Sequence, residues 1–95
     1  MSSKEQQIKA AVLDRLVEHL QSHKEVQNID LMILANFCRN CLSRWYMEAA
    51  QELDEDIDQD KARELIYGMP YTQWKEEFQL PATPEQLEAL EKRSK

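Results

Sequence analysis

The chain has 95 residues, of which 42% are hydrophobic and 32% are charged, with one glycine and three prolines. Its formal net charge is −6 and it has no basic stripe, which excludes nucleic acids and anionic membrane surfaces as partners recognised through charge. No stretch approaches the ~20 apolar residues of a membrane span, and the N-terminus lacks the apolar core of a signal peptide. We therefore expect one cytoplasmic domain over residues 1–95, with a core small enough for dimerisation to be a natural supplement.

The predicted elements, taken in chain order, are all helices. Ser3 and Gln6 match a capping box, and the helix that they begin ends near Ser22 or His23. The polar linker 24–27 is short, so we expect the next helix to fold back against the first as an antiparallel neighbour. That next helix, residues 28–53, is the predicted centre of the fold because it holds the longest apolar run and contains neither glycine nor proline.

Three shorter helices are predicted after an acidic segment. Asp58 is the expected N-cap of a helix over residues 59–67, which Gly68 closes in a left-handed conformation. Residues 71–78 fit a short helix with an aromatic face, and Pro84 begins the last one. The sequence thus predicts an all-α fold of about five helices around a central helix 28–53, assembled as an oligomer.

A subunit interface is predicted at the start of the central helix. Met32 and Ile33 lie on the side of that helix that later becomes polar, so its first turns are apolar nearly all round. A helix of that kind is normally buried on every side, which favours a homo-oligomer, with a dimer preferred. The aromatic residues Trp45, Tyr71 and Trp74 are expected in the core or in such an interface rather than in a ligand site.

Cys38 and Cys41 lie one helical turn apart, as do His19 and His23 on the helix predicted to be their neighbour. These four residues have the ligand types of a tetrahedral zinc or iron site. The alternative that we prefer is that the cysteines pack beside Trp45 and the histidines lie on the surface. Redox chemistry at the cysteines is disfavoured because about two helical turns precede Cys38, whereas reactive pairs lie at a helix N-terminus.

Other kinds of site find little support in the sequence. There is no phosphate-binding loop, nucleophile elbow or HExxH motif, so no catalytic residue is predicted. The alternating acids of residues 54–60 lack the glycine and glutamate of a calcium loop. Arg39 and Arg44, beside Asn40 and Ser43, fit either an anion pocket or a solvated surface.

Several strings of residues resemble a known family. They are QNIDLM from Gln27, FCRNCLSRWY from Phe37, and GMPY from Gly68 followed by Trp74. Over roughly residues 13–78 they resemble the short bacterial proteins of domain-of-unknown-function family 1244. The resemblance implies a small, all-helical, oligomeric bacterial protein and no particular activity. The FCRNC and GMPY strings also imply the expected functional positions, namely Cys38, Arg39, Asn40, Cys41, Tyr71 and Trp74.

The leading hypothesis from the sequence is a self-associating protein-interaction or regulatory module without catalytic activity or cofactor, whose protein partner is not identified. The alternative is a zinc, iron or thiol-redox protein that uses Cys38 and Cys41, with His19 and His23 as further metal ligands. A small-molecule enzyme comes third, without a substrate that the sequence names.

Overall fold

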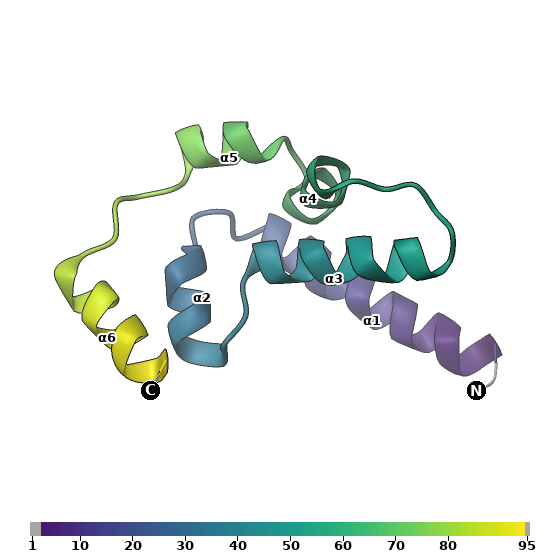
Figure 1. Cartoon of the computed structure of the whole chain (residues 1–95), viewed down its shortest axis with the longest axis horizontal. Coiled ribbons are helices and arrows are strands. Elements are labelled where there is room, and N and C mark those ends of the chain that lie inside the picture. The colour runs from purple at the N-terminus through teal and green to yellow at the C-terminus, as the bar shows by residue number, and fades with distance from the viewer. Residues whose placement is uncertain (1–2, 95) are drawn as a thin grey trace.

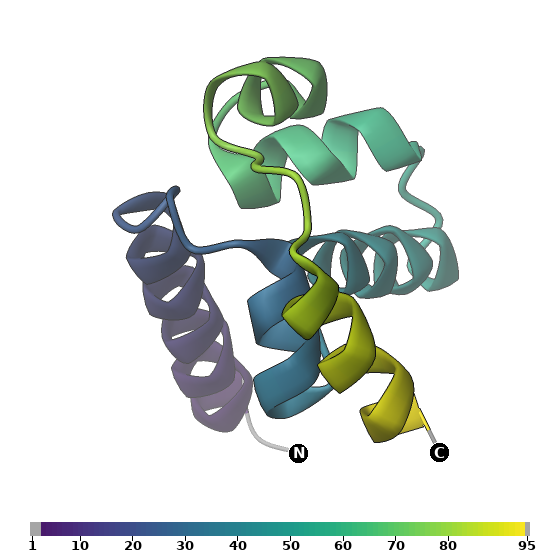
Figure 2. The ribbon, with the colours of Figure 1, turned by 90° about the vertical axis from the view of Figure 1, so that its left-hand side faces the viewer.

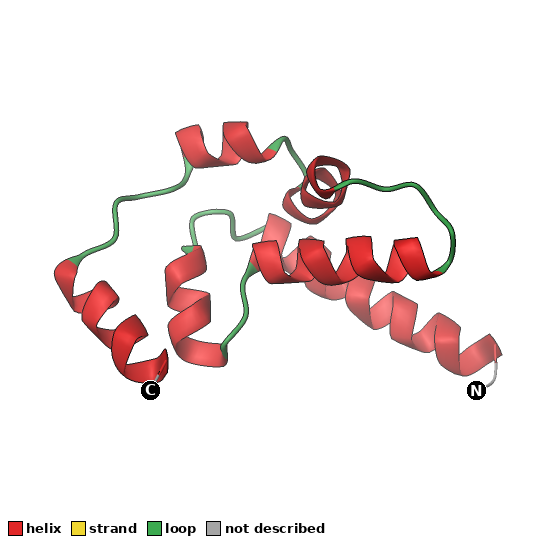
Figure 3. Cartoon of the chain, in the orientation of Figure 1, coloured by secondary structure: helices red, strands yellow, loops and turns green. Residues whose placement is uncertain are grey.

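A computed structural model describes residues 3–94, and this part of the chain is helical without any strand (Figures 1 and 3). The all-α class is therefore confirmed, with six helices in the described range where about five were predicted. No helix among these residues has the length and apolar character needed to cross a membrane. The helices are α1 (Ser3–Gln21), α2 (Asn28–Ala35), α3 (Arg39–Glu52), α4 (Gln59–Tyr67), α5 (Tyr71–Glu77) and α6 (Pro84–Ser94).

The predicted central helix 28–53 is wrong as a single element, because the chain divides it into α2 and α3. Asn36 ends α2 in the left-handed conformation, with φ 62° and ψ 28°. Cys38 is extended, with φ −148° and ψ −177°, and forms the N-cap of α3. Asparagine tolerates left-handed backbone better than most residues, so the break needs no glycine. As a result α3 leaves in a different direction from α2 (Figure 1).

Helix α4 begins and ends where the sequence predicts. The Asp58 carboxylate accepts a hydrogen bond of 2.8 Å from a backbone N–H in the first turn. Gly68 closes the helix at φ 73°, which glycine adopts without steric cost. The side-chain amide of Gln21, at the end of α1, donates to the carbonyl oxygens of Leu65 (3.1 Å) and Ile66 (3.3 Å). These two bonds join the ends of α1 and α4.

The apolar core is small and lies where α1, α3 and α4 meet. Its buried members are Leu20, Leu42 and Ile66, one from each of these helices. The most extensive packing is between α3 and α4, and α1 packs against α4 rather than alongside α2 as predicted. Half-buried residues complete the cluster, namely Leu16, Val17, Leu31 and Phe37.

Helix α6 returns to the start of the central region and lies beside α2 (Figure 2). Thr83 and Gln86 form a reciprocal cap at its start, with bonds of 2.8 and 3.1 Å. The Gln86 amide also donates to the Asp30 carboxylate of α2 at 2.9 Å. The segment between α5 and α6 is thereby held across the start of α2.

Candidate functional site

Arg39 is the centre of a buried polar network. It is the first residue of α3, and the turn at Asn36 directs its side chain into the molecule, where only 1% of the residue is exposed. One terminal nitrogen of the guanidinium donates to the carbonyl oxygen of Val26 at 2.7 Å and to Oδ1 of Asn28 at 2.9 Å. The other donates to the carbonyl oxygen of His23 at 2.9 Å. Arg39 thus ties the α1–α2 linker to the start of α3.

The cation of Arg39 has aromatic neighbours but no salt bridge among the described residues, and the carboxylate of Glu25 acts on it only at longer range. Its guanidinium carbon lies 5.2 Å from the centre of the Trp74 ring, which is itself buried. The indole N–H of Trp74 donates to the carbonyl oxygen of Lys24 at 3.1 Å. Burial lowers the pKa of Arg39, and the tyrosine Tyr67 beside it opposes that effect. The site therefore holds a positive charge that neutral oxygens and an aromatic ring stabilise.

A chain of hydrogen bonds runs outward from Arg39 to the surface. Asn28, which accepts from Arg39, donates through Nδ2 to the hydroxyl of Tyr67 at 3.0 Å. The Tyr67 hydroxyl donates to Oδ1 of Asn40 at 2.7 Å, and Nδ2 of Asn40 donates to the Tyr71 hydroxyl at 3.5 Å. Burial raises the pKa of Tyr67, so its hydroxyl keeps its proton and remains a donor at neutral pH. The chain ends at Tyr71, on α5.

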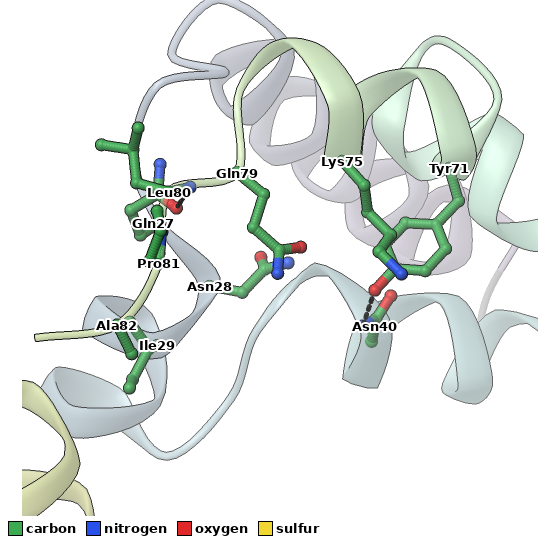
Figure 4. A pocket seen from close by; sticks show the side chains of 10 residues that line it. All are labelled: Gln27, Asn28, Ile29, Asn40, Tyr71, Lys75, Gln79, Leu80, Pro81 and Ala82. Atoms are coloured by element: carbon green, nitrogen blue, oxygen red, sulfur yellow. Dashed lines mark hydrogen bonds between the residues drawn. The ribbon is translucent and has the colours of Figure 1, made fainter.

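A cleft of about 460 Å³ opens at the outer end of this chain (Figure 4). Gln27 holds one wall in place, because its buried amide donates to the carbonyl oxygen of Phe78 and accepts from the N–H of Leu80, both at 2.9 Å. The Tyr71 ring forms another wall and contacts two cations, the guanidinium of Arg63 at 4.5 Å and the ammonium of Lys75 at 5.4 Å. The lining residues are Gln27, Asn28, Ile29, Asn40, Tyr71, Lys75, Gln79, Leu80, Pro81 and Ala82.

The two cysteines lie next to this network as free thiols. Cys38 is buried at the N-cap of α3, and Cys41 is half-buried in the first turn. The prediction that two helical turns precede Cys38 is therefore wrong, since the helix begins after it. Burial raises the pKa of Cys38, although the backbone N–H groups of Cys41 and Asn40 act in the opposite direction. The Cys38 thiol therefore stays protonated at neutral pH.

The four predicted metal ligands do not form one site in the part of the chain that the structure describes, although Cys38 and Cys41 lie close together. There, no three histidine, cysteine, aspartate or glutamate side chains gather in a way that would hold a metal ion. His19 and His23 stack on each other, with ring centres 4.4 Å apart, on the exposed side of the α1 end. His23 contributes its backbone carbonyl to the network, not its ring.

The structure divides the predicted binding residues into two groups. Arg39, Asn40, Tyr71 and Trp74 come together in the network, although they lie on two different helices. The remaining three lie elsewhere, with Met32 and Ile33 half-buried on α2 and Trp45 exposed on α3.

Of the two alternatives for Arg39 and Arg44, the anion pocket does not form. Arg44 is exposed on the surface, whereas Ser43 is fully buried and donates its hydroxyl to the Arg39 carbonyl oxygen at 2.8 Å. Ser43 therefore belongs to the interior of α3 and presents nothing to an anion.

Sequence reasoning missed Gln27, Asn28, Tyr67 and Lys75 as members of the site. Asn28 had a signal that pointed elsewhere, because it lies where a helix cap is expected. In the structure Gln27 is the N-cap of α2, and the Asn28 side chain forms hydrogen bonds with Arg39 and Tyr67 instead. Tyr67 lies in the last turn of α4, and only the packing of α4 on α3 brings it to Asn40.

The comparisons with known proteins agree with the resemblance seen in the sequence. No curated protein matches the chain. A family model described as "Protein of unknown function (DUF1244)" matches residues 26–92. The match begins at Val26, whose carbonyl accepts from Arg39, and it covers α2 to α5 and most of α6, with the cleft and both cysteines. Because the match spans well over half of the chain, this protein belongs to the DUF1244 family.

Proposed function

We propose that the protein is a self-associating helical module that acts by binding other proteins, and that a second copy covers the outer part of α1. Every residue from 3 to 15 is exposed, so the first turns of α1 extend beyond the rest of the chain (Figure 1). Ile8 and Val12 on this stretch are each 65% exposed. This uncovered apolar helix is the observation that carries the proposal.

The total surface of the chain supports a partner of the size of a second copy. The accessible area is 7018 Å², whereas a folded monomer of 11.3 kDa is expected to expose roughly 5,700 Å². The radius of gyration is 14.9 Å, against roughly 12 Å expected for a compact domain of this length. The excess area exceeds the about 800 Å² that each partner buries in a standard interface.

The energetics of α1 favour the same conclusion. An isolated helix shorter than about 12–15 residues is marginal in water, so the outer part of α1 gains from tertiary cover. Burying the exposed parts of Ile8 and Val12 would contribute about 1–2 kcal/mol for each side chain. A symmetric pair of α1 helices would gain this contribution twice, because both copies present the same surface.

Introducing a negative charge on the apolar face of α1 tests the proposal. We expect the wild-type chain to be a dimer at micromolar concentration by light scattering, and Ile8→Glu or Val12→Glu to yield a monomer. Leu34→Glu is the matched control, because Leu34 is 83% exposed on α2 and lies next to the predicted interface residues Met32 and Ile33.

The control separates the two candidate interfaces. Loss of the dimer in Leu34→Glu with retention in Val12→Glu would move the interface to α2, as the sequence predicts. A monomeric wild-type protein would reject self-association altogether.

Thiol or metal chemistry at Cys38 and Cys41 is the second candidate function. The observation that favours it is the position of the pair, with Cys38 as the N-cap and Cys41 in the first turn of α3, which is where reactive Cys-x-x-Cys pairs lie. Oxidation by glutathione disulfide would remove one hydrogen from each thiol, form the Cys38–Cys41 disulfide and release two molecules of glutathione.

This candidate is tested by mass spectrometry in a glutathione redox buffer and by elemental analysis for zinc or iron. A Cys38→Ser/Cys41→Ser double variant serves as the control for both measurements. If the wild-type chain neither loses two hydrogens nor retains metal in excess of the double variant, the cysteines serve only in packing.

A further inference from the structure

The cleft between α2, α5 and residues 79–82 has a polar end and an apolar end. At the polar end, Tyr71 and Lys75 extend from α5 toward Asn40 (Figure 4). At the opposite end, Ile29 of α2 lies beside Ala82 (Figure 4). The volume of about 460 Å³ is within the range of small-molecule sites, which are mostly apolar with a few converging polar groups.

The hydrogen-bond chain that starts at Arg39 fixes which atoms the polar end presents. Arginine has donors but no acceptor, so Asn28 must turn its oxygen to Arg39 and its nitrogen to Tyr67. Tyr67, having accepted, donates to the oxygen of Asn40, and the Asn40 nitrogen therefore faces Tyr71. Tyr71 accepts that bond and keeps its own hydrogen for a group in the cleft. The polar end thus presents a hydrogen-bond donor, and it is complementary to a ligand group that accepts hydrogen bonds.

The charge of the cleft also favours an anion. Among the described residues that line it, Lys75 is the single charged side chain and none is an aspartate or glutamate, although the chain carries eighteen acids. Arg39 lies behind Asn28 and adds a buried positive charge, which the negative charge of Glu25 partly offsets without a salt bridge. The buried charge of Arg39 acts through a lower dielectric than water, whereas Lys75 is exposed. The one charged side chain that lines the cleft among the described residues is therefore positive, whereas the protein as a whole carries a net charge of −6.

We propose that this cleft binds a small organic carboxylate. The carboxylate accepts hydrogen bonds from the Tyr71 hydroxyl and the Lys75 ammonium, and the hydrocarbon part lies toward Ile29 and Ala82. One lysine matches the single charge of a carboxylate, whereas a phosphate monoester carries nearly two. This site is separate from the outer part of α1, so it does not depend on self-association.

The first test compares three probes of the same length by calorimetry and by amide chemical shifts of the full chain. Hexanoate should bind saturably, with shifts at Asn40, Tyr71 and Lys75. The neutral 1-hexanol and the cationic hexylammonium should bind about ten- to a hundredfold more weakly, since charge-assisted hydrogen bonds are stronger than neutral ones. Absence of saturable hexanoate binding, or equal binding of 1-hexanol, would overturn the proposal. Tighter binding of inorganic phosphate than of hexanoate would overturn the carboxylate assignment.

The second test uses variants that keep the packing of α5. Tyr71→Phe removes the hydroxyl but keeps the ring, which lies 5.2 Å from that of Tyr67. Lys75→Met removes the charge but keeps an unbranched side chain. Each should weaken hexanoate binding about tenfold or more, with unchanged thermal unfolding.

The matched control for Lys75→Met is Lys61→Met, which removes the same charge from an exposed position on α4. It should change hexanoate binding less than about twofold, because Lys61 does not line the cleft and salt screens exposed charges. If all three variants bind hexanoate like the wild-type protein, the cleft is not the site. If Lys61→Met weakens binding as much as Lys75→Met, the binding is an effect of net charge and the proposal fails.

Discussion

Replacing Arg39 by methionine tests whether the buried guanidinium holds the fold together. The side chain makes three hydrogen bonds, to the backbone carbonyls of His23 and Val26 and to the side chain of Asn28. All three acceptors lie in the linker or at the start of α2, so their loss would free the α1–α2 connection from α3. Methionine fills a similar volume and keeps contact with Trp74, so the substitution isolates the polar contribution.

Two opposing terms set the size of the effect. Hydrogen bonds to a charged group contribute about 1.5–3 kcal/mol each, so the three bonds together amount to roughly 4–9 kcal/mol. Removing the buried charge also removes its desolvation cost of several kcal/mol, and this offsets part of the loss in stability. We expect the bonds to prevail, so that Arg39→Met lowers the free energy of unfolding by about 2–4 kcal/mol. Domains of this kind have roughly 5–15 kcal/mol in total, so the loss is large.

Urea unfolding followed by tryptophan fluorescence measures this loss, with all variants at one protein concentration because self-association shifts apparent stability. The melting temperature should fall by roughly 8–30 °C. Arg39→Lys should be at least as destabilised, because one ammonium keeps the buried charge but cannot replace two donor nitrogens. Arg15→Met, at an exposed position on α1, should change stability by less than about 0.5 kcal/mol. An Arg39→Met variant as stable as the wild-type protein would refute the reasoning.

Three further predictions concern other parts of the fold. Burial raises the pKa of Tyr67, so the folded state keeps a proton that the unfolded chain loses above pH ~10. The free energy of unfolding should then fall by about 1.4 kcal/mol per pH unit above that pH, and urea titrations of Tyr67→Phe should lack this part of the fall. Gly68→Ala should lower stability by roughly 1–2 kcal/mol, because the residue has φ +73° and a Cβ would approach the Gln21 side chain to 2.8 Å. An unchanged urea midpoint would contradict this. Iodoacetamide should modify Cys41 before Cys38, because Cys38 is buried and burial raises its pKa. Peptide mass mapping checks the order, and equal rates in the native protein would be inconsistent with the burial of Cys38.

Helix α4 shows what local sequence can predict. Its start depends on the Asp58 side chain and the N–H groups of its own first turn, and its end depends on the left-handed Gly68. Both signals operate within a few residues of each other, so neighbouring helices do not alter them. The cap of α6 at Thr83 and Gln86 is predictable for the same reason.

The break at Asn36 shows what local sequence does not predict. The segment around it has good helical periodicity and no glycine or proline, so a continuous helix is the better local solution. A continuous helix would keep Arg39 on a solvated face, away from the α1–α2 linker. The fold instead places the guanidinium of Arg39 against the carbonyls of His23 and Val26. The left-handed backbone of Asn36 produces the change in chain direction between α2 and α3. Leu34, near the end of α2, is 83% exposed.

The candidate site depends partly on residues that the sequence identifies and partly on tertiary packing. Arg39 and Asn40 were identified from the strings that resemble the family, and Tyr71 and Trp74 from the same source. Their common location depends on α4, because Tyr67 joins Asn40 to Asn28 across three helices. No periodicity within one helix carries that information. The lysine of the cleft, Lys75, has no distinguishing local pattern at all.

The sequence by itself determined the helical class, the absence of strong motifs for catalysis, and those helix ends that depend on nearby residues. Capping bonds and the left-handed glycine are local interactions, so a few neighbouring residues suffice to specify them. Only the tertiary structure decided where the central apolar segment breaks, that Arg39 is buried, and that α1 extends uncovered. These features depend on contacts between residues far apart in the chain, whose free energy outweighs the helical preference of the segment around Asn36.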